Sequence, residues 1–395
     1  MKISKRKLLV LLAFSTLLNT TAVIKLTFPR LINKFQQYTS QRQHILQTAN
    51  DTTLYINGQS LAVYGKYHNE NNWYRFPSSL KEKLRPEVWE LSKNSSGIYI
   101  DFSTNSPYLK AKWQLKKGLQ PRNMTAIGAS GLDLYVKEND QLKYVCSGIP
   151  DQLQNEQTLI SGMDSSVKDF RIYLPLYNEV EYLSIGIDPK AFHNSPRGNT
   201  SAKPIVFYGT SITQGGSASR PGMAYPSIIS RILNKEVINL GFSGNGLFEK
   251  SVGDAIIEID ASIYVIDCTP NAHPMTIQEN ALNLIKHLRA TNKQTNKQTP
   301  ILLIESIYRT PSYLKQEPDS VFGTHAFITN QNKELRKVFT EAVALGFSDI
   351  YYLNSKELIG NDREGTVDGT HFSDLGHYRM AQSVSGKIKQ ITTLK

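Results

Sequence analysis

The side chains best suited to chemistry stand at two places in the second half of the chain. Ser211 lies in the run GTSIT (209–213), directly after an apolar stretch, and Asp368 and His371 stand three residues apart near the C-terminus. In acyl transfer, an imidazole removes the proton of an attacking hydroxyl, and a carboxylate fixes the tautomer of that imidazole. A serine, a histidine and an aspartate therefore suffice for an acyl-enzyme mechanism if the fold brings them together.

Two further segments carry groups that could stabilise an oxyanion. The run NLGFSGNG (239–246) contains glycines, which let the backbone approach a ligand closely and present an N–H. Asn271 follows Pro270 in DCTPN, and its side-chain amide can donate to a developing negative charge. Taken together, the four segments supply each role that acyl transfer requires.

Each segment also has a plainer explanation. Ser211 could serve only as a helix N-cap, and the glycines and Asn271 could be ordinary turn residues. His371 could be a structural histidine packed under a loop. Asp368, His371, Asp374 and His377 recur every three residues, which raises the alternative of a metal site. A loop ending in a helix N-cap near Ser373 would prevent those four side chains from sharing one face.

The elements that must position these residues form an alternating pattern. Near-continuous apolar runs occur at 205–209, 237–241, 263–268, 301–306 and 350–354, as expected for parallel strands buried on both faces. Helical patterns lie between them, for example at 224–233, 277–288 and 331–344. This alternation predicts a doubly wound α/β domain over residues 203–395, in which ligands bind at the carboxyl ends of the strands.

The preceding part of the chain has a different pattern. Short alternating apolar segments at 96–103, 108–115, 131–138, 142–148 and 170–177 are separated by turn residues, which predicts an antiparallel β-sandwich over residues 51–192. A polar stretch with Pro and Gly at 192–203 is typical of a linker. Two domains also agree with the length of 395 residues.

The four chemical segments resemble the conserved blocks of SGNH (GDSL-like) hydrolases, in the same order, over about residues 203–392. The resemblance implies a flavodoxin-like three-layer fold with Ser211 as nucleophile, Asp368 as acid and His371 as base. It also implies an oxyanion hole made by the N–H groups of Ser211 and Gly244 and by the side chain of Asn271.

Two positions depart from the family pattern. Thr210 stands where the best-known motif has Asp, a side chain that performs no step of the triad chemistry. Asn271 follows Thr-Pro rather than the commoner Gly-x. Upstream, GLDLY (131–135) and LPLY (174–177) resemble the GxDLY domain that precedes some bacterial SGNH hydrolases, with Tyr135 and Tyr177 expected as core aromatics of the sandwich.

The N-terminus has the pattern of a targeting segment. Eight of the eleven net positive charges come from residues 1–50, which contain no acid. A basic start followed by the apolar run 8–18 predicts a signal peptide or an uncleaved membrane anchor within residues 1–28, and thus export. Residues 29–50 form a polar lead-in. The remaining charge shows no basic stripe interleaved with aromatics, so we expect no nucleic-acid partner.

The expected function is that of an exported serine esterase that needs no metal or organic cofactor. Export, the β-rich domain and the family resemblance favour a small-molecule or glycan ester, with acetyl as the acyl group and carbohydrate as the alcohol. Arg220 and Tyr225 in the loop 216–225, together with His273, are the candidate substrate contacts. The alternatives are a lipase or lysophospholipase with the same triad, and a non-catalytic carbohydrate-binding protein of the cell surface.

Overall fold

The computed structural model describes residues 52–118, 121–195, 203–290, 299–316, 323–356 and 358–393. The predicted targeting segment (1–28) and the polar lead-in (29–50) lie outside these residues. Residues 53–395 form one compact unit. Within the described residues, we find no helix with the length and apolar character that a membrane span requires.

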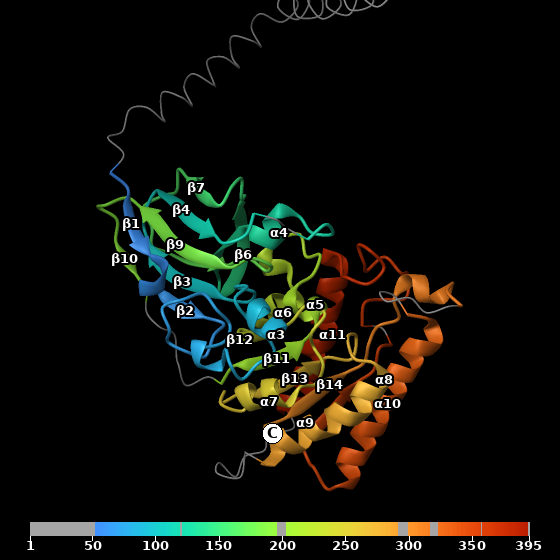
Figure 1. Cartoon of the computed structure of the whole chain (residues 1–395). Helices are drawn as coiled ribbons and strands as arrows, with labels where there is room; N and C mark the ends of the chain where they lie inside the picture. Colours follow the sequence, from blue (N-terminus) through green and yellow to red (C-terminus); the bar gives the residue numbers. More distant parts are fainter. Residues whose placement is uncertain are drawn as a thin grey trace, which may run out of the picture. The chain divides into compact units, whose positions relative to one another are not determined.

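The first part of this unit consists of two antiparallel sheets packed face to face (Figure 1). One sheet has the strand order β1-β9-β4-β7, and the other has the order β10-β3-β8-β5-β6, with β2 paired to β3. The strands are β1 (Leu54–Asn57), β2 (Ala62–Tyr64), β3 (Tyr99–Thr104), β4 (Tyr108–Leu115), β5 (Leu132–Glu138), β6 (Gln141–Gly148), β7 (Gln154–Ser161), β8 (Lys168–Tyr173), β9 (Val180–Ile187) and β10 (His193–Asn194).

Side-chain alternation explains the sandwich. In β4, every second residue is buried, so that Leu109, Ala111 and Trp113 point into one core. Ile100 and Phe102 of β3 enter the same core from the opposite sheet. Because successive side chains of a strand point to opposite faces, this pattern leaves the other face for solvent or for further contacts.

The second part contains a five-stranded parallel sheet with the strand order β12-β11-β13-β14-β15. These strands are β11 (Ile205–Gly209), β12 (Val237–Gly241), β13 (Ile263–Asp267), β14 (Ile301–Ile304) and β15 (Ile350–Leu353). The chain enters the sheet at β11 and then runs to opposite sides of it, so the carboxyl end of β11 is a topological switch point. This arrangement confirms the predicted α/β sheet.

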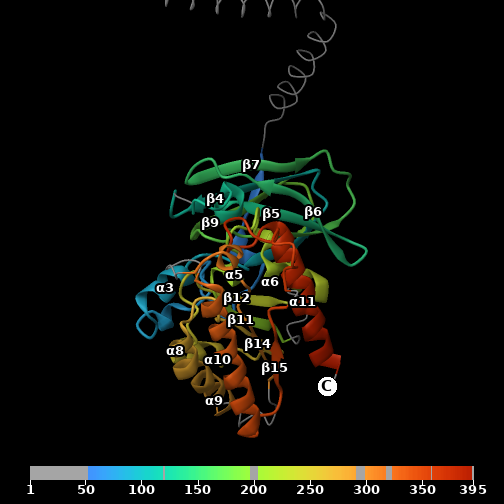
Figure 2. The ribbon, with the colours of Figure 1, turned by 90° about the vertical axis from the view of Figure 1, so that its right-hand side faces the viewer.

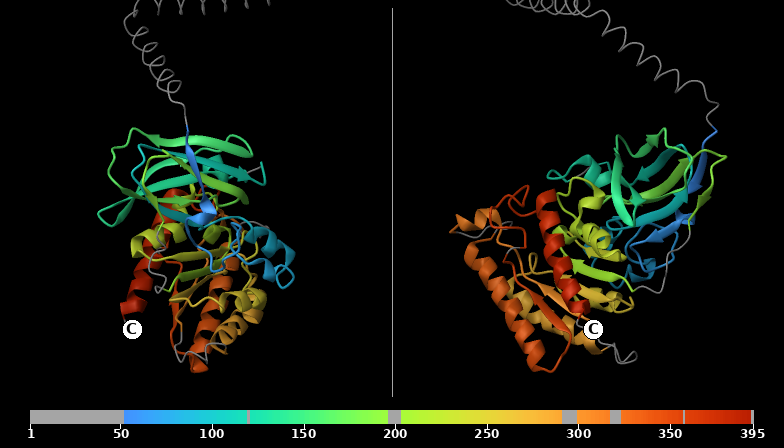
Figure 3. Two further views of the ribbon diagram at one scale, coloured as in Figure 1. Left: turned by 90° about the vertical axis from the view of Figure 1, so that its left-hand side faces the viewer. Right: turned by 180° about the vertical axis from the view of Figure 1, so that it is seen from behind.

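Helices cover both faces of the parallel sheet, and Figures 2 and 3 show α10 and α11 on opposite sides of it. One face packs on α6 (Tyr225–Leu233) and α11 (Asp374–Thr393). The other packs on α7 (Lys250–Ile256), α9 (Leu282–Ala290) and α10 (His325–Ala344). Alternate residues of each strand enter the two cores, as Ile205 and Val206 of β11 illustrate.

The first part also contributes to one of these cores. Helix α3 (Pro86–Ser92) begins at Pro86, and its residues Val88 and Trp89 are buried in the same cluster as α7 and α9. The sequence patterns identified strands in this region but not this helix. The two parts therefore share an apolar interface in addition to the polar contacts described below.

The predicted elements agree with the structure at most strand positions and less well at helix ends. Helix α10 begins at His325, because Thr324 caps it, rather than at residue 331. The predicted helix at 277–288 is divided into α8 (Pro274–Thr276), a π-helical turn (Ile277–Ala281) and α9. The remaining helices are α4 (Ala126–Ser130) and α5 (Ser211–Gln214), with 3₁₀ turns at Gly58–Ser60, Ser78–Leu80, Pro221–Met223 and Thr310–Tyr313.

Candidate active site

The structure brings together the serine, histidine and aspartate that the sequence singled out. His371 Nε2 lies 3.0 Å from Ser211 Oγ, and His371 Nδ1 lies 2.7 Å from Asp368 Oδ2. If Nδ1–H donates to the carboxylate, Nε2 is left as the acceptor of the Ser211 hydroxyl hydrogen. That tautomer is the one in which an imidazole can act as a general base toward serine.

Ser211 owes its position to a sharp transition from strand to helix. It is the first residue of α5, two residues after the end of β11. The Thr210 side chain accepts from the Ile212 N–H, and Thr210 and Thr213 together form a capping box. As the first helical residue, Ser211 has a backbone N–H with no acceptor inside the helix. Thr210 thus acts as a buried helix cap at the position where it departs from the family motif.

Asp368 is held as a carboxylate by several donors. Its Oδ1 accepts from the backbone N–H groups of Thr370, at 3.0 Å, and His371, at 2.8 Å. Partial burial tends to raise the pKa of Asp368, but the hydrogen bonds from His371 and Asn123 outweigh it and lower the pKa to about 2. The carboxylate is therefore ionised throughout the neutral range, as a partner for an imidazolium must be.

Asn123 was not identified from the sequence. It comes from the loop before α4, in the first part of the chain, and its Nδ2 donates to Asp368 Oδ2 at 2.8 Å. The same Nδ2 lies 3.1 Å from His371 Nδ1. That nitrogen directs its own hydrogen at Asp368, so the amide packs against the imidazole without a second hydrogen bond. An isolated asparagine in a polar segment carries no sequence signal for this role.

The two residues predicted to complete the oxyanion hole with the Ser211 N–H, Gly244 and Asn271, follow β12 and β13. Gly244 is exposed and has a φ of +71°, a left-handed conformation that favours glycine, with open space where a Cβ would stand. Asn271 Oδ1 accepts from the Gly246 N–H at 3.3 Å, so its Nδ2 donor is at the opposite end of the amide. Both groups lie at the same edge of the sheet as Ser211, at the carboxyl ends of the two strands that flank β11.

Buried polar side chains hold the loops that carry these groups. Gln331 of α10 donates to the carbonyl oxygens of Thr269 and Ala272, on either side of Asn271. On the other loop, the fully buried Arg75 of the first part donates to the carbonyl oxygens of Asn239 and Gly241. Burial lowers the pKa of Arg75 to about 9, which still leaves the guanidinium charged at neutral pH.

The structure does not bring all of the predicted substrate contacts to the triad. The Tyr225 side chain has no exposed surface, and its hydroxyl donates to Asp267 at 2.9 Å, so it is a core residue rather than a sugar contact. Arg220 is directed to Asp133 and Tyr135 and stacks on Tyr144. Its guanidinium is therefore engaged by the first part of the chain.

The third predicted contact has a different position. His273 is exposed, two residues after Asn271, and caps α8 by accepting from the Met275 N–H. Its ring lies 5.5 Å from that of Phe327, measured between centroids. A contact between His273 and a substrate stays a prediction.

The two tyrosine motifs connect the first part of the chain to the catalytic loops. Asp133 of GLDLY is fully buried, and its Oδ2 accepts from Arg220 Nη1 and from the Gly222 N–H, each at 2.8 Å. The Tyr177 hydroxyl donates to the carbonyl oxygen of Ser211 at 3.2 Å. Both motifs are thus more than core aromatics, because they hold the backbone of the loops around Ser211.

The alternative of a metal site at the C-terminal segment is not supported by the side-chain directions. Asp374 accepts from the N–H and hydroxyl of Ser219, while His377 is fully buried with its Nε2 3.1 Å from the Gly216 carbonyl oxygen. Neither side chain is directed to the Asp368–His371 pair. Among the described residues, no three acidic, histidine or cysteine side chains group as metal ligands would.

Comparison with known families agrees with this geometry. Residues 202–389 match the GDSL-like lipase/acylhydrolase family, and residues 53–192 match the GxDLY family, the N-terminus of SGNH hydrolase-type esterases. The crystal structure of a protein described as a GDSL-like lipase from Bacteroides ovatus is 35% identical, with a TM-score of 0.81, over 87% of this chain and 98% of that one. The chain therefore belongs to the GDSL-like acylhydrolases of the SGNH class that carry an N-terminal GxDLY domain, and it is a serine hydrolase.

More distant structures share the fold. A salicylyl-acyltransferase from a tetracycline biosynthetic pathway is 16% identical, with a TM-score of 0.69, over 88% of this chain and 99% of that one. A family two carbohydrate esterase from Clostridium thermocellum, in complex with cellohexaose, is 15% identical, with a TM-score of 0.53, over 75% and 92%. No curated protein sequence matches significantly.

Proposed function

We propose that this protein is an esterase that removes short acyl groups, chiefly acetyl, from carbohydrate by way of an acyl-enzyme on Ser211. The observation that carries the proposal is the continuous chain of hydrogen bonds from Asp368 through His371 to the Ser211 hydroxyl, at 2.7 and 3.0 Å. Ester hydrolysis itself follows from the family, whereas the acyl group and the alcohol are our inference.

The mechanism uses only groups of this chain. His371 Nε2 takes the hydroxyl proton as Ser211 Oγ attacks the ester carbonyl, and the Asp368 carboxylate stabilises the imidazolium that results. The N–H groups of Ser211 and Gly244 and the amide of Asn271 donate to the oxyanion. His371 then protonates the leaving alcohol. In the second half of the reaction, His371 takes a proton from water as the water attacks the acyl-enzyme, and it returns that proton to Ser211 Oγ as the carboxylic acid leaves.

Two considerations favour a carbohydrate as the alcohol. The described rim next to Asn271 includes His273, an exposed side chain that can exchange hydrogen bonds with sugar hydroxyls. The family two carbohydrate esterases share the fold, and one of them binds cellohexaose. A lipase of the same triad remains the alternative within the class.

The direct test is the hydrolysis of p-nitrophenyl acetate by Ser211→Ala, with Ser166→Ala as the matched control at an exposed serine of the first part. We expect the rate to fall by at least about a thousandfold in Ser211→Ala and to stay unchanged in the control. A fluorophosphonate probe should label the wild-type protein and not Ser211→Ala. Full activity of Ser211→Ala would exclude the mechanism.

Substrate preference is tested separately. In a series of p-nitrophenyl esters, kcat/KM should be highest for acetyl and fall with chain length, and acetate should be released from acetylated oligosaccharides. A kcat/KM that rises toward long chains would favour the lipase. Absence of labelling by the fluorophosphonate probe would favour a non-catalytic carbohydrate-binding protein.

A further inference from the structure

A cavity lies at the carboxyl edge of the parallel sheet, the edge at which the triad also lies. It encloses about 510 Å³ between the end of β14, helix α10 and the segment after β15, and its lining includes Glu305, Tyr308, Lys333, Arg336 and Lys356. Ligands of open α/β sheets bind at the carboxyl ends of the strands, which is where this cavity opens. None of its lining residues takes part in the proposed acyl transfer.

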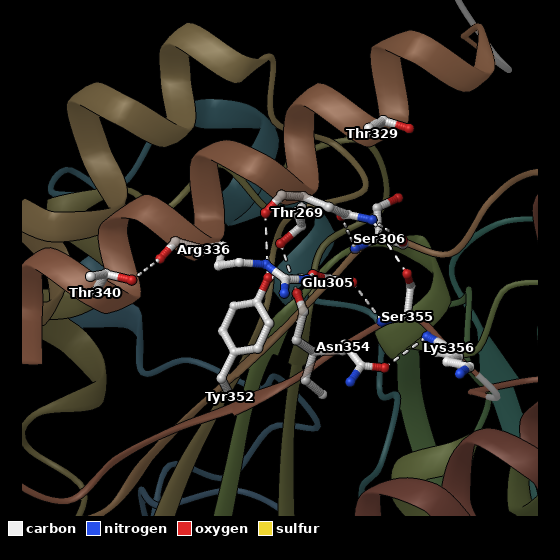
Figure 4. A network of polar contacts seen from close by, with 12 residues as sticks. Thr269, Glu305, Ser306, Thr329, Arg336, Thr340, Tyr352, Asn354, Ser355 and Lys356 are labelled. Carbon is white, nitrogen blue, oxygen red and sulfur yellow. Dashed lines mark hydrogen bonds and ion pairs between the residues drawn. The ribbon is translucent and has the colours of Figure 1, made fainter.

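The buried acid of this cavity is already compensated. Glu305 is only 3% exposed, and its Oε1 accepts from Arg336 Nη2 at 2.6 Å and from the Tyr352 hydroxyl at 2.5 Å. Its Oε2 accepts from the Ser355 N–H at 2.6 Å. Figure 4 shows Arg336 of α10 and Tyr352 of β15 converging on this carboxylate. Because its acceptors are occupied and its charge is paired, Glu305 does not oppose an incoming anion.

Two lysines then give the cavity an excess of positive charge. Lys333 lies on α10 and Lys356 lies on the segment after β15, and both residues are exposed. Among the described lining residues, Glu305 is the sole acid, so two positive charges remain once its pair with Arg336 is counted. A concave, partly apolar site with two exposed lysines, and with no second acid in its described lining, favours an anionic group of the ligand.

The described lining includes one aromatic side chain, Tyr308, which is partly exposed. The Tyr308 ring stacks on His325, with centroids 4.3 Å apart and an interplanar angle of 19°, and Tyr313 packs beside both rings. Tyr313 is 42% exposed and lies outside the described lining of the cavity. Flat aromatic rings present a rigid apolar face with polar edges, which complements the C–H face of a pyranose ring.

The cavity is joined to the triad by one short loop. Thr310, two residues after Tyr308, donates its N–H to the carbonyl oxygen of Gly369 at 2.9 Å, between Asp368 and His371 in sequence. Arg309 donates to the carbonyl oxygen of Pro270, next to Asn271. The loop that carries Tyr308 into the cavity is therefore hydrogen-bonded to both catalytic loops.

We infer that this cavity is a glycan subsite that receives a sugar residue bearing a carboxylate, with Lys333 and Lys356 paired to the carboxylate and Tyr308 against the ring. The inference rests on the proposed esterase function and names its substrate class, an acetylated acidic polysaccharide. A sugar bound here would be a neighbour of the acetylated residue rather than the acetylated residue itself.

The experiment compares acetate release from acetylated oligogalacturonides with free carboxylates and from the same oligosaccharides with the carboxylates methyl-esterified. The test variant is the double substitution Lys333→Ala/Lys356→Ala. The control is Lys81→Ala/Lys83→Ala, which removes the same number of positive charges at exposed lysines before α3. We expect kcat/KM on the charged glycan to fall about tenfold in the first double variant, as for two partly exposed ion pairs. The methyl-esterified glycan and the Lys81/Lys83 control should show no change.

The ratio of kcat/KM on the charged glycan to kcat/KM on the methyl-esterified glycan should also decrease as NaCl rises from about 0.05 to about 0.5 M, because salt screens exposed charges. Equal kcat/KM on the two glycans, an unchanged Lys333/Lys356 variant, or no acetate release from the charged glycan would each overturn the inference. Hydrolysis of p-nitrophenyl acetate does not use the cavity. A wild-type protein that does not hydrolyse p-nitrophenyl acetate would instead refute the esterase function. Failure of the subsite inference and failure of the proposed function are therefore distinguishable.

Discussion

The hydrogen bond from Asn123 to Asp368 predicts how much activity is lost when Asn123 is replaced by alanine. Asn123→Ala removes one of four donors that the structure gives this carboxylate, at 2.8 Å from Oδ2. A hydrogen bond to a charged group contributes about 1.5–3 kcal/mol when it is well shielded. The Asp368 side chain is 33% exposed, so we take the effect as about 1 kcal/mol.

A loss of this size in the transition state lowers kcat about fivefold. The Asp368 pKa, at about 2, would rise with the loss of the donor but stay well below neutral pH, so the carboxylate should remain ionised. The KM for p-nitrophenyl acetate should not change, because Asn123 contacts the acid–base pair and not the ester. Asn69→Ala, at an exposed asparagine of the same part of the chain, is the control.

A second substitution separates positioning from a general loss of structure. Asn123→Asp places another carboxyl group beside Asp368, and its negative charge favours the protonated imidazole. The acidic limb of the kcat/KM profile should therefore move to higher pH in Asn123→Asp, while Asn123→Ala moves it far less. A kcat of Asn123→Ala within twofold of the wild type, together with an unmoved profile in Asn123→Asp, would refute the positioning role.

Two buried titratable groups, His377 and Asp267, should change the free energy of unfolding with pH in opposite directions. Burial lowers the pKa of His377 to about 4, so the unfolded state binds more protons than the folded state between pH 6.5 and 4. The free energy of unfolding therefore decreases as the pH falls through that window, by at most about 3 kcal/mol. Chemical denaturation should show that this loss is absent in His377→Gln. Burial raises the pKa of Asp267 to about 7, although hydrogen bonds from the Thr213 and Tyr225 hydroxyls lower it in part. The free energy of unfolding therefore decreases as the pH rises from about 4 to 7, by up to about 4 kcal/mol. Asp267→Asn should flatten that decline, and an unchanged slope in either variant would contradict the corresponding assignment.

The sequence was sufficient for the elements whose pattern is strong. Five apolar runs located all five strands of the parallel sheet, because strands buried on both faces admit few polar residues. The same logic located Ser211, which follows a buried strand directly, and the histidine and aspartate of the last loop. These residues have local signals in type and spacing.

The sequence was not sufficient where a role depends on a distant partner. Tyr225 and Arg220 lie in a polar loop and suggested a pocket rim, but Asp267 and Asp133 hold them from other parts of the chain. Asn123 reaches the triad only because α4 packs on the loop after α5. Gly128 of α4 lies so close to Ala218 that a Cβ would come within 2.2 Å of its carbonyl oxygen. No local pattern records such an approach.

These contacts explain why the β-sandwich part is more than an appendage. Three of the four loops of the site receive a group from it: Tyr177 holds the carbonyl oxygen of Ser211, Arg75 holds the loop before Gly244, and Asn123 holds the Asp368 carboxylate. Productive geometry in a triad must be held to within fractions of an ångström by surrounding hydrogen bonds and packing. Since buried Val88 and Trp89 also complete a core of the parallel-sheet part, the catalytic loops and the sandwich are best understood as one folding and functional unit.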